Sequence, residues 1–230
     1  MVLHRDQFKF PATRILIFAK APILNQVKTR LISDLGAQKA TRLYQLMLHQ
    51  TVATAVNSHL CNVQLCCAPD IEHEDFLELR SRYSVELVTQ QGANLGERMF
   101  FAASQALKTS NSVLIIGTDC LQMAEFQLGQ ALSLLQSKSY DVVVTPAHDG
   151  GYVLLGLNRV SPELFEGIEW GTDRVMDQTR SALDGLGWKW HESTLLRDVD
   201  TIDDIQHIYK NEHQYLLDTG VRELVQSIFS

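Results

Sequence analysis

The sequence predicts an α/β protein whose sheet is covered by helices on both faces. Short β-type runs alternate with amphipathic helical stretches up to about residue 145, which is typical of a doubly wound sheet with right-handed crossovers. The runs VLII at 113–116 and VVV at 142–144 are continuously apolar, as expected for strands that are buried on both faces. Additional strands after residue 150 indicate a mixed sheet.

The individual elements follow from these patterns. We expect strands at 15–19, 63–68, 85–88, 113–116, 142–145, 151–157 and 188–195. The last is inferred from the alternation of apolar and polar residues in WKWHESTL. We expect helices at 37–57, 72–82, 95–108, 124–137, 173–186, 203–217 and 221–229. In the first of these, Leu43, Leu46, Met47 and Val56 recur close to helical spacing.

Composition restricts the class of protein. Of the 230 residues, 45% are hydrophobic and 20% are charged, which is typical of a soluble globular chain. There is no internal repeat, low-complexity linker or charge block, so we expect one domain over residues 1–230. The formal net charge of −7 argues against a nucleic-acid partner, although a phosphorylated small molecule requires only a local basic patch.

Cysteine usage and hydropathy predict a cytoplasmic protein. Cys61, Cys66, Cys67 and Cys120 form no CxxC pair and lie in apolar surroundings, which favours buried free thiols over a zinc site. The N-terminal stretch lacks the apolar core of a signal peptide. No run approaches the ~20 apolar residues that a membrane span requires. The oligomeric state is left open, a homo-oligomer included.

Ligands of such sheets gather beyond the carboxyl ends of the parallel strands, so the loops at these ends are the candidate site. The loop after the first strand contains Lys20, Lys28, Thr29 and Arg30, whose cations and hydroxyl suit phosphate oxygens. It is not a P-loop, and no GxGxxG occurs in the chain. The alternative is a solvated loop whose charges aid solubility.

The next two strand ends are also candidates. After the third strand, Gly92 and Gly96 would let a ligand approach the backbone near Arg98, where a helix begins; the alternative is an ordinary turn. After the fourth strand, Asp119 is well placed to bind Mg²⁺ or Mn²⁺, which prefer oxygen ligands. A helix-capping role for Asp119 is the competing interpretation.

Two later segments complete the set. The stretch His148-Asp149-Gly150-Gly151 exposes backbone N–H groups beside a carboxylate, although a simple Asp-Gly hairpin turn is as good an interpretation. A lone turn histidine such as His148 is more often solvated than catalytic. Thr201, Asp203 and Asp204 are typical of a helix start, which leaves Asp198 and Asp200 as candidates for a second metal carboxylate. Together these residues fit metal-assisted chemistry on a nucleoside di- or triphosphate.

The ordered motifs FAKAP…VKTRL, QGANLGERM, LIIGTDC, AHDGGYVLLGL, FEGIEWGTDRV and DVDTIDDI resemble a bacterial family of glycosyltransferase-A-like proteins. This family was once a domain of unknown function and is also called radical-SAM/selenodomain-associated transferase 1 or arsenosugar biosynthesis glycosyltransferase. The resemblance covers a core of about 14–205, after which helices at 203–229 close the chain. It implies a three-layer α/β/α, Rossmann-like mixed sheet of the nucleotide-diphospho-sugar transferase (GT-A) type.

The resemblance also implies roles for individual residues. Asp119 and Asp200 resemble the metal ligands, with Asp198 as the alternative to Asp200. The loop containing Lys20, Lys28, Thr29 and Arg30 would bind phosphates, and the loop with Gly92, Gly96 and Arg98 would lie near the nucleotide. The acceptor side would comprise Gly150, Gly151, Trp170 and Thr172. We expect Lys28, Asp119 and Asp149 to act in catalysis.

This sequence departs from the family pattern at two turns. Leu24-Asn25 replaces a usual Pro-Gly pair, and Asn tolerates a left-handed backbone better than most residues. Leu121 replaces a proline that commonly follows the GTDC motif, so the next helix is expected to begin differently.

Three functions remain open at this stage. The first is a metal-dependent transferase that uses a nucleotide sugar and a small-molecule acceptor and releases a nucleoside diphosphate. The second is a nucleotidyltransferase that joins an NTP to a phosphorylated small molecule and releases pyrophosphate, which two cations on one loop, Lys28 and Arg30, would suit. The third is a non-catalytic nucleotide-binding protein, because fold does not fix function.

Overall fold

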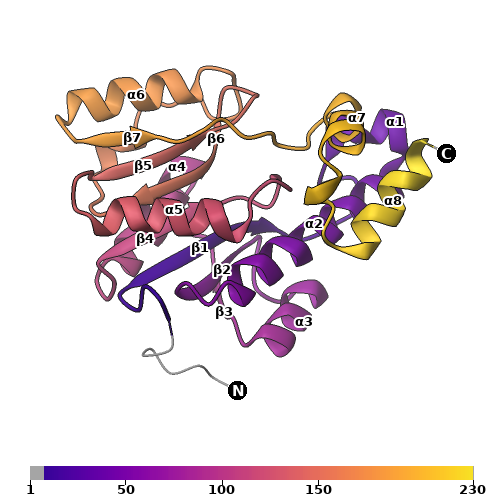
Figure 1. Cartoon of the computed structure of the whole chain (residues 1–230), viewed down its shortest axis with the longest axis horizontal. Coiled ribbons are helices and arrows are strands. Elements are labelled where there is room, and N and C mark those ends of the chain that lie inside the picture. The colour runs from indigo at the N-terminus through magenta and orange to yellow at the C-terminus, as the bar shows by residue number, and fades with distance from the viewer. Residues whose placement is uncertain (1–7, 230) are drawn as a thin grey trace.

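The structure, a computed structural model, describes residues 8–229 and consists of a sheet between layers of helices (Figure 1). Its strands are β1 (Thr13–Lys20), β2 (Asn62–Ala68), β3 (Glu86–Thr89), β4 (Ser112–Ile116), β5 (Val142–Pro146), β6 (Tyr152–Leu157) and β7 (Trp190–Glu192). Its α-helices are α1 (Ile32–Leu35), α2 (Ala37–Asn57), α3 (Glu74–Tyr83), α4 (Leu95–Ala106), α5 (Glu125–Gln136), α6 (Val175–Gly185), α7 (Ile202–Asn211) and α8 (Thr219–Phe229).

The sheet is mixed, as the sequence predicts. The strand order is β3-β2-β1-β4-β6-β5-β7. β1 pairs in parallel with β2 and β4, and β5 pairs in parallel with β7. β6 is the exception, because it runs antiparallel to both β4 and β5. The carboxyl ends of β1, β3, β4 and β5 therefore lie along one edge, where the sequence places its candidate loops.

Alternate residues of the strands enter two different cores. Ile15 and Ile17 of β1 belong to the core that also contains Phe76 of α3 and Leu128 of α5. Leu16, between them, belongs to the core on the other face, with side chains from α4 and α6. Every residue of β4 is buried, as the unbroken VLII run predicts. The three-layer α/β/α arrangement is thereby confirmed.

A third apolar cluster lies beside the sheet. It joins Leu31 and Leu43, near the start of the chain, to Ile205 of α7 and Val221 of α8. Figure 1 shows α7 and α8 next to α1 and the adjacent part of α2. This packing anchors the segment that precedes α7, and that segment carries Asp198 and Asp200.

Several expected elements differ in extent. The strand expected at 188–195 is only β7, because the N–H of Trp188 donates to Leu183 O at 3.2 Å and so still belongs to the end of α6. The helix expected at 203–217 ends at Asn211 and is followed by a 3₁₀ turn at His213–Tyr215. The short α1, which follows a 3₁₀ turn at Thr29–Leu31, has no counterpart in the predicted elements.

Two other expectations can be compared with the structure. The four cysteines are buried and carry free thiols, as predicted from their spacing. Burial raises the pKa of each of these thiols, for Cys61 to about 12, which favours the uncharged form. Among the helices that the structure describes, none is both long and apolar enough to cross a membrane.

Candidate functional site

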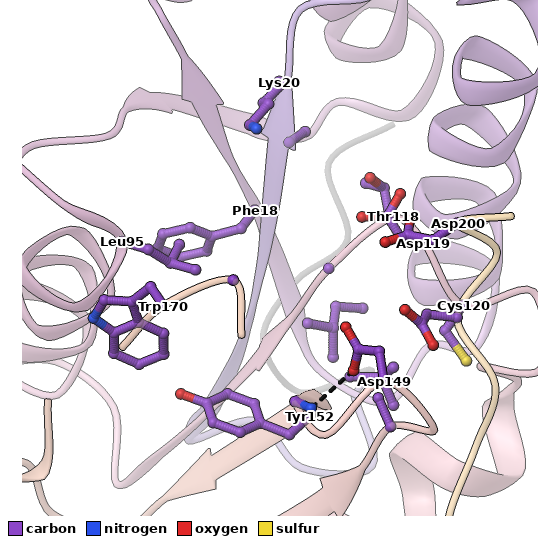
Figure 2. A pocket seen from close by; sticks show the side chains of 18 of the residues that line it. Phe18, Lys20, Leu95, Thr118, Asp119, Cys120, Asp149, Tyr152, Trp170 and Asp200 are labelled. Carbon is purple, nitrogen blue, oxygen red and sulfur yellow. Dashed lines mark hydrogen bonds between the residues drawn. The ribbon is translucent and has the colours of Figure 1, made fainter. Parts of the chain in front are cut away.

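A pocket of about 610 Å³ lies at the carboxyl ends of the parallel strands (Figure 2). Most of the residues predicted for the site line it: Lys20, Lys28, Thr29, Arg30, Arg98, Asp119, Asp149, Gly151, Trp170, Thr172 and Asp200, together with the alternative ligand Asp198. The predicted residues Gly92, Gly96 and Gly150 do not line it. The strand-end loops therefore converge on one pocket. The three glycines lie outside its lining and affect its shape through their contacts with other segments.

Asp119 follows β4 after a turn at Gly117-Thr118. The next helix, α5, begins only at Glu125 with Ala124 as its N-cap, so Asp119 does not cap a helix. Its carbonyl oxygen accepts a hydrogen bond from the N–H of Val199 at 2.8 Å. This bond places the late segment containing Asp198 and Asp200 directly beside the end of β4.

Lys28 links these segments through its ammonium group. The side chain is only 3% exposed, and Nζ donates to Val199 O at 2.7 Å and to Asp200 Oδ1 at 3.1 Å. The ammonium also pairs with Asp119 Oδ1. Burial alone would lower the pKa of Lys28, but the two carboxylates outweigh it and the pKa is raised. Lys28 is thus a buried, charged bridge between the two expected metal ligands.

The backbone of the first loop explains how Lys28 reaches this position. Asn25 and Lys28 have φ angles of 64° and 47°, both in the left-handed region. Asparagine adopts this region more readily than most residues, so the turn forms without the usual glycine. A 3₁₀ turn follows at once and exposes Arg30, whose Nη1 lies 3.4 Å from Asp200 Oδ2.

Asp149, Asp198 and Asp200 form an acidic cluster. One carboxylate oxygen of each lies within 4.8 Å of the others. Asp198 is 8% exposed, and its burial, followed by the charges of Asp149 and Asp200, raises the pKa of its carboxyl to about 7. Three carboxylates this close are the oxygen-rich ligand set that a divalent cation prefers. Asp200 belongs both to this cluster and to the Lys28 bridge.

The opposite end of the pocket is aromatic and apolar. Figure 2 shows Phe18, Leu95 and Trp170 gathered there, away from the carboxylates, and the ring of Tyr152 points toward Trp170 from beside Asp149. The rings of Tyr152 and Trp170 meet edge to face with centroids 6.4 Å apart. One cavity therefore combines a charged end with a surface on which a planar or sugar ring can stack.

The glycines outside the lining set the shape of these walls. A Cβ at Gly96 would lie 2.8 Å from Trp170 Nε1, so only glycine lets the Trp170 segment approach α4. Gly92 O accepts a hydrogen bond from Arg98 Nε at 3.0 Å. Gly150 has a φ of 88°, and a Cβ there would lie 2.2 Å from Asp173 O. All three glycines therefore affect how the segments around the pocket pack, without lining it themselves.

The turn between β5 and β6 has the structure of a hairpin and also faces the site. Asp149 Oδ1 accepts a hydrogen bond from the N–H of Gly151 at 2.8 Å, which orients the carboxylate in the pocket (Figure 2). The hairpin-turn interpretation is confirmed, and the role of Asp149 in catalysis stays a prediction. His148 is exposed and does not line the pocket.

Sequence reasoning missed several polar residues in the lining, two of which make hydrogen bonds to backbone atoms at the strand ends. The hydroxyl of Tyr44, on α2, accepts from Lys20 N at 2.8 Å and donates to Lys20 O at 3.1 Å. Gln90 Nε2 donates to Ala19 O at 3.1 Å and to Cys66 O at 2.8 Å. Tyr44 lies within an apolar helical stripe, so nothing in the sequence pattern marks it as a site residue. Gln90 directly follows a strand, and that position is a signal for the site.

Comparison with solved structures relates this geometry to known proteins. A protein of Desulfovibrio desulfuricans G20, provisionally named a nucleotide-diphospho-sugar transferase, superposes with a TM-score of 0.83 at 27% identity, over 94% of this chain and 98% of that one. Two others share the fold at lower identity. The 4-diphosphocytidyl-2C-methyl-D-erythritol synthase of Anaerococcus prevotii DSM 20548 gives a TM-score of 0.58 at 13% identity, over 90% and 98% of the two chains.

The third is the glucosyl-3-phosphoglycerate synthase of Mycobacterium tuberculosis, solved with Mn²⁺, UDP and glucosyl-3-phosphoglycerate. It gives a TM-score of 0.50 at 10% identity, over 90% of this chain and 78% of that one. No curated protein matches the sequence. A family whose description reads "uncharacterized protein conserved in bacteria" (DUF2064) matches residues 51–172. That match spans more than half of the chain, which therefore belongs to the DUF2064 family and has the fold of the nucleotide-diphospho-sugar transferases.

Proposed function

We propose that this protein is a metal-dependent glycosyltransferase, which moves a sugar from a nucleotide-sugar donor to a small-molecule acceptor and releases a nucleoside diphosphate. The observation that carries the proposal is the combination, in one pocket, of Lys28, a three-carboxylate cluster and an aromatic wall. The transferase class is supported by the fold shared with the Desulfovibrio protein.

The cations that line the pocket suit a diphosphate. Lys20, Arg30 and Arg98 line the pocket and would neutralise phosphate oxygens, with the two arginines offering planar forks. Lys28 would hold Asp119 and Asp200 in place through the contacts already described. Lys28 and its two carboxylate partners are held in place before a ligand arrives, so this part of the site would need little reorganisation as a diphosphate departs.

The donor set fits Mg²⁺ or Mn²⁺. Asp119 and Asp200 would hold the ion, with Asp198 as the alternative to Asp200. Burial, followed by the charges of Asp149 and Asp200, raises the pKa of the Asp198 carboxyl, and a bound cation would oppose this effect. A bound divalent cation would supply Lewis-acid stabilisation of the diphosphate. Asp149, oriented by the Gly151 N–H, would accept the proton of the acceptor hydroxyl.

A nucleotidyltransferase is the second candidate. Lys20 and Arg30, at the two ends of the loop after β1, both line the pocket, and two cations on one loop suit a triphosphate. The fold likeness to the 4-diphosphocytidyl-2C-methyl-D-erythritol synthase is compatible with this activity. Both activities would use the same nucleotide pocket. They differ in the bond that breaks, which is the bond from the sugar to the diphosphate in the glycosyltransferase and the bond between the α- and β-phosphates in the nucleotidyltransferase.

The deciding experiment is a panel of NTPs and nucleotide sugars with Mn²⁺ or Mg²⁺ and candidate acceptors. Release of a nucleoside diphosphate supports the glycosyltransferase, and release of pyrophosphate supports the nucleotidyltransferase. We expect metal and nucleotide together to raise the melting temperature. Asp119→Asn and Asp200→Asn should lose most of that shift. The exposed Asp203→Asn, which removes an acid outside the pocket, is the matched control.

A wild-type response from both Asp119→Asn and Asp200→Asn would refute the metal assignment. Tight nucleotide binding with no turnover of any donor would instead favour a non-catalytic nucleotide-binding protein.

A further inference from the structure

A second group of potential metal ligands lies between α2 and α3, outside the pocket. It consists of His49 on α2 and of Asp75 and Glu78 on α3, and one ligand atom of each lies within 4.8 Å of the others. None of the three lines the pocket. The proposed transferase function therefore leaves this group without a role.

Helical spacing places these side chains on facing surfaces. Asp75 and Glu78 are three residues apart on α3, so they share one face, and Gln45 and His49 are four apart on the facing side of α2. His49 Nε2 lies 3.0 Å from Asp75 Oδ1. Two ligand atoms at ~2.0 Å from a tetrahedral zinc ion are roughly 3.3 Å apart. His49 and Asp75 would therefore need to move little to bind the same ion.

The burial of Asp75 is a second, independent observation. Its side chain is only 3% exposed, and the described residues place no lysine or arginine within ion-pair distance of it. Its carboxylate accepts from Gln45 Nε2 at 2.6 Å, and His73 Nδ1, 3.4 Å away, already accepts the N–H of Asp75 at 3.3 Å. A buried carboxylate is costly unless it is paired with a cation, and among the described residues only the imidazoles of His49 and His73 lie close enough to share positive charge with Asp75.

We propose that His49, Asp75 and Glu78 bind a zinc ion that braces α2 against α3. Zinc would replace the proton shared by His49 Nε2 and Asp75 Oδ1, while the exposed Glu78 and a water complete a tetrahedral site. Gln45 would keep donating to the carboxylate and so orient it from the outer shell. An imidazole ligand favours zinc over the Mg²⁺ or Mn²⁺ expected in the pocket.

Calorimetric titration of the purified full chain with Zn²⁺, together with its melting temperature, tests this site. Three variants are compared with wild type. His49→Gln and Glu78→Gln each remove one ligand at a position that is not fully buried. Glu74→Gln removes the same charge from an exposed position one turn away on α3, and Asp200→Asn reports on zinc that binds in the pocket.

We expect one zinc ion per chain to bind at this site and to raise the melting temperature. His49→Gln and Glu78→Gln should weaken the binding by about tenfold or more, with loss of the thermal shift. Glu74→Gln and Asp200→Asn should leave the zinc affinity and the zinc-induced rise in melting temperature unchanged. The site is refuted if wild type takes up no zinc, if either ligand variant binds like wild type, or if Glu74→Gln weakens binding as much as Glu78→Gln. These outcomes do not depend on nucleotide binding, so they are independent of the proposed transferase activity.

Discussion

Lys28 Nζ donates a hydrogen bond to Asp200 Oδ1 at 3.1 Å, which joins the loop after β1 to the segment after β7. The same ammonium pairs with Asp119, so three segments far apart in the chain meet at one buried cation. This contact determines where the acidic groups of the pocket stand. Its removal should therefore affect both stability and ligand binding.

Lys28→Met should lower the free energy of unfolding by about 2 kcal/mol, less than for a fully buried pair because both aspartates are partly exposed. Removing the cation leaves its carboxylates facing one another without compensation. Urea denaturation measures the change, and exposed Lys39→Met is the control, with an expected effect close to zero. The double variant Lys28→Met, Asp200→Asn should lose less free energy of unfolding than the sum of the two single variants. Strictly additive losses would show that the Lys28–Asp200 contact contributes nothing to stability.

Asp204 should make stability depend on acid pH. Burial raises the pKa of its carboxyl, but hydrogen bonds from Thr201 Oγ1 at 2.7 Å and Arg197 Nη1 at 2.9 Å outweigh burial and lower it. A pKa that is lower in the folded than in the unfolded state stabilises the fold above about pH 4, and this is lost as pH falls through the folded pKa. Asp204→Asn should cost about 1–2 kcal/mol at pH 7 and little at pH 2, as measured by urea denaturation. An equal loss at both pH values would contradict this.

Gly150→Ala should destabilise the turn behind the pocket by roughly 3 kcal/mol, because a left-handed alanine and an overlap with Asp173 O both add cost. Gly167→Ala is the matched control, since its φ of 69° is similarly left-handed but nothing lies within 4 Å of the added Cβ. The control should lose only about 1 kcal/mol in the same denaturation experiment. Equal losses would mean that the contact with Asp173 is unimportant.

Trp170 should report ligand binding. Its ring lies in the aromatic wall, so a bound nucleotide or sugar should change its fluorescence, and Trp170→Phe should abolish that change. Trp190→Phe, on β7 and outside the lining, should retain it. Trp170→Ala should weaken binding by about tenfold through loss of ring contact. A signal unchanged in Trp170→Phe would place the ligand away from this wall.

Much of the fold follows from local patterns. The buried strands and α2 are predicted because their apolar spacing matches the structural period, and the start of α2 agrees to the residue. β7 is shorter than its alternating pattern suggests, because Trp188 is held by the end of α6 and pairing resumes only as an isolated bridge between Leu196 and Ala147. Such limits depend on tertiary hydrogen bonds that no window of sequence contains.

The site is predicted in outline for a similar reason. Strand-end position is local information, so Asp119 and Asp149 are placed in the pocket from the sequence, whereas Asp200 is placed there by the resemblance of its DVDT motif to the family. Which side chains contact these carboxylates depends on segments far apart in the chain, so it cannot be predicted from the residues around them. The bridge from Lys28 to both Asp119 and Asp200 depends on a left-handed backbone at Lys28 and on the Val199–Asp119 hydrogen bond. Tyr44 is hidden because its ring is part of an apolar helix face while its hydroxyl reaches the end of β1.

The Val199–Asp119 hydrogen bond also separates the scaffold from part of the site. Every strand that the structure describes ends at or before Glu192, whereas Asp198 and Asp200 follow it in a segment that belongs to no strand. The sheet therefore positions Asp119, and the late segment adds two of the three carboxylates of the acidic cluster through this backbone contact. Loss of that contact would remove two carboxylates from the pocket while leaving every strand pairing intact.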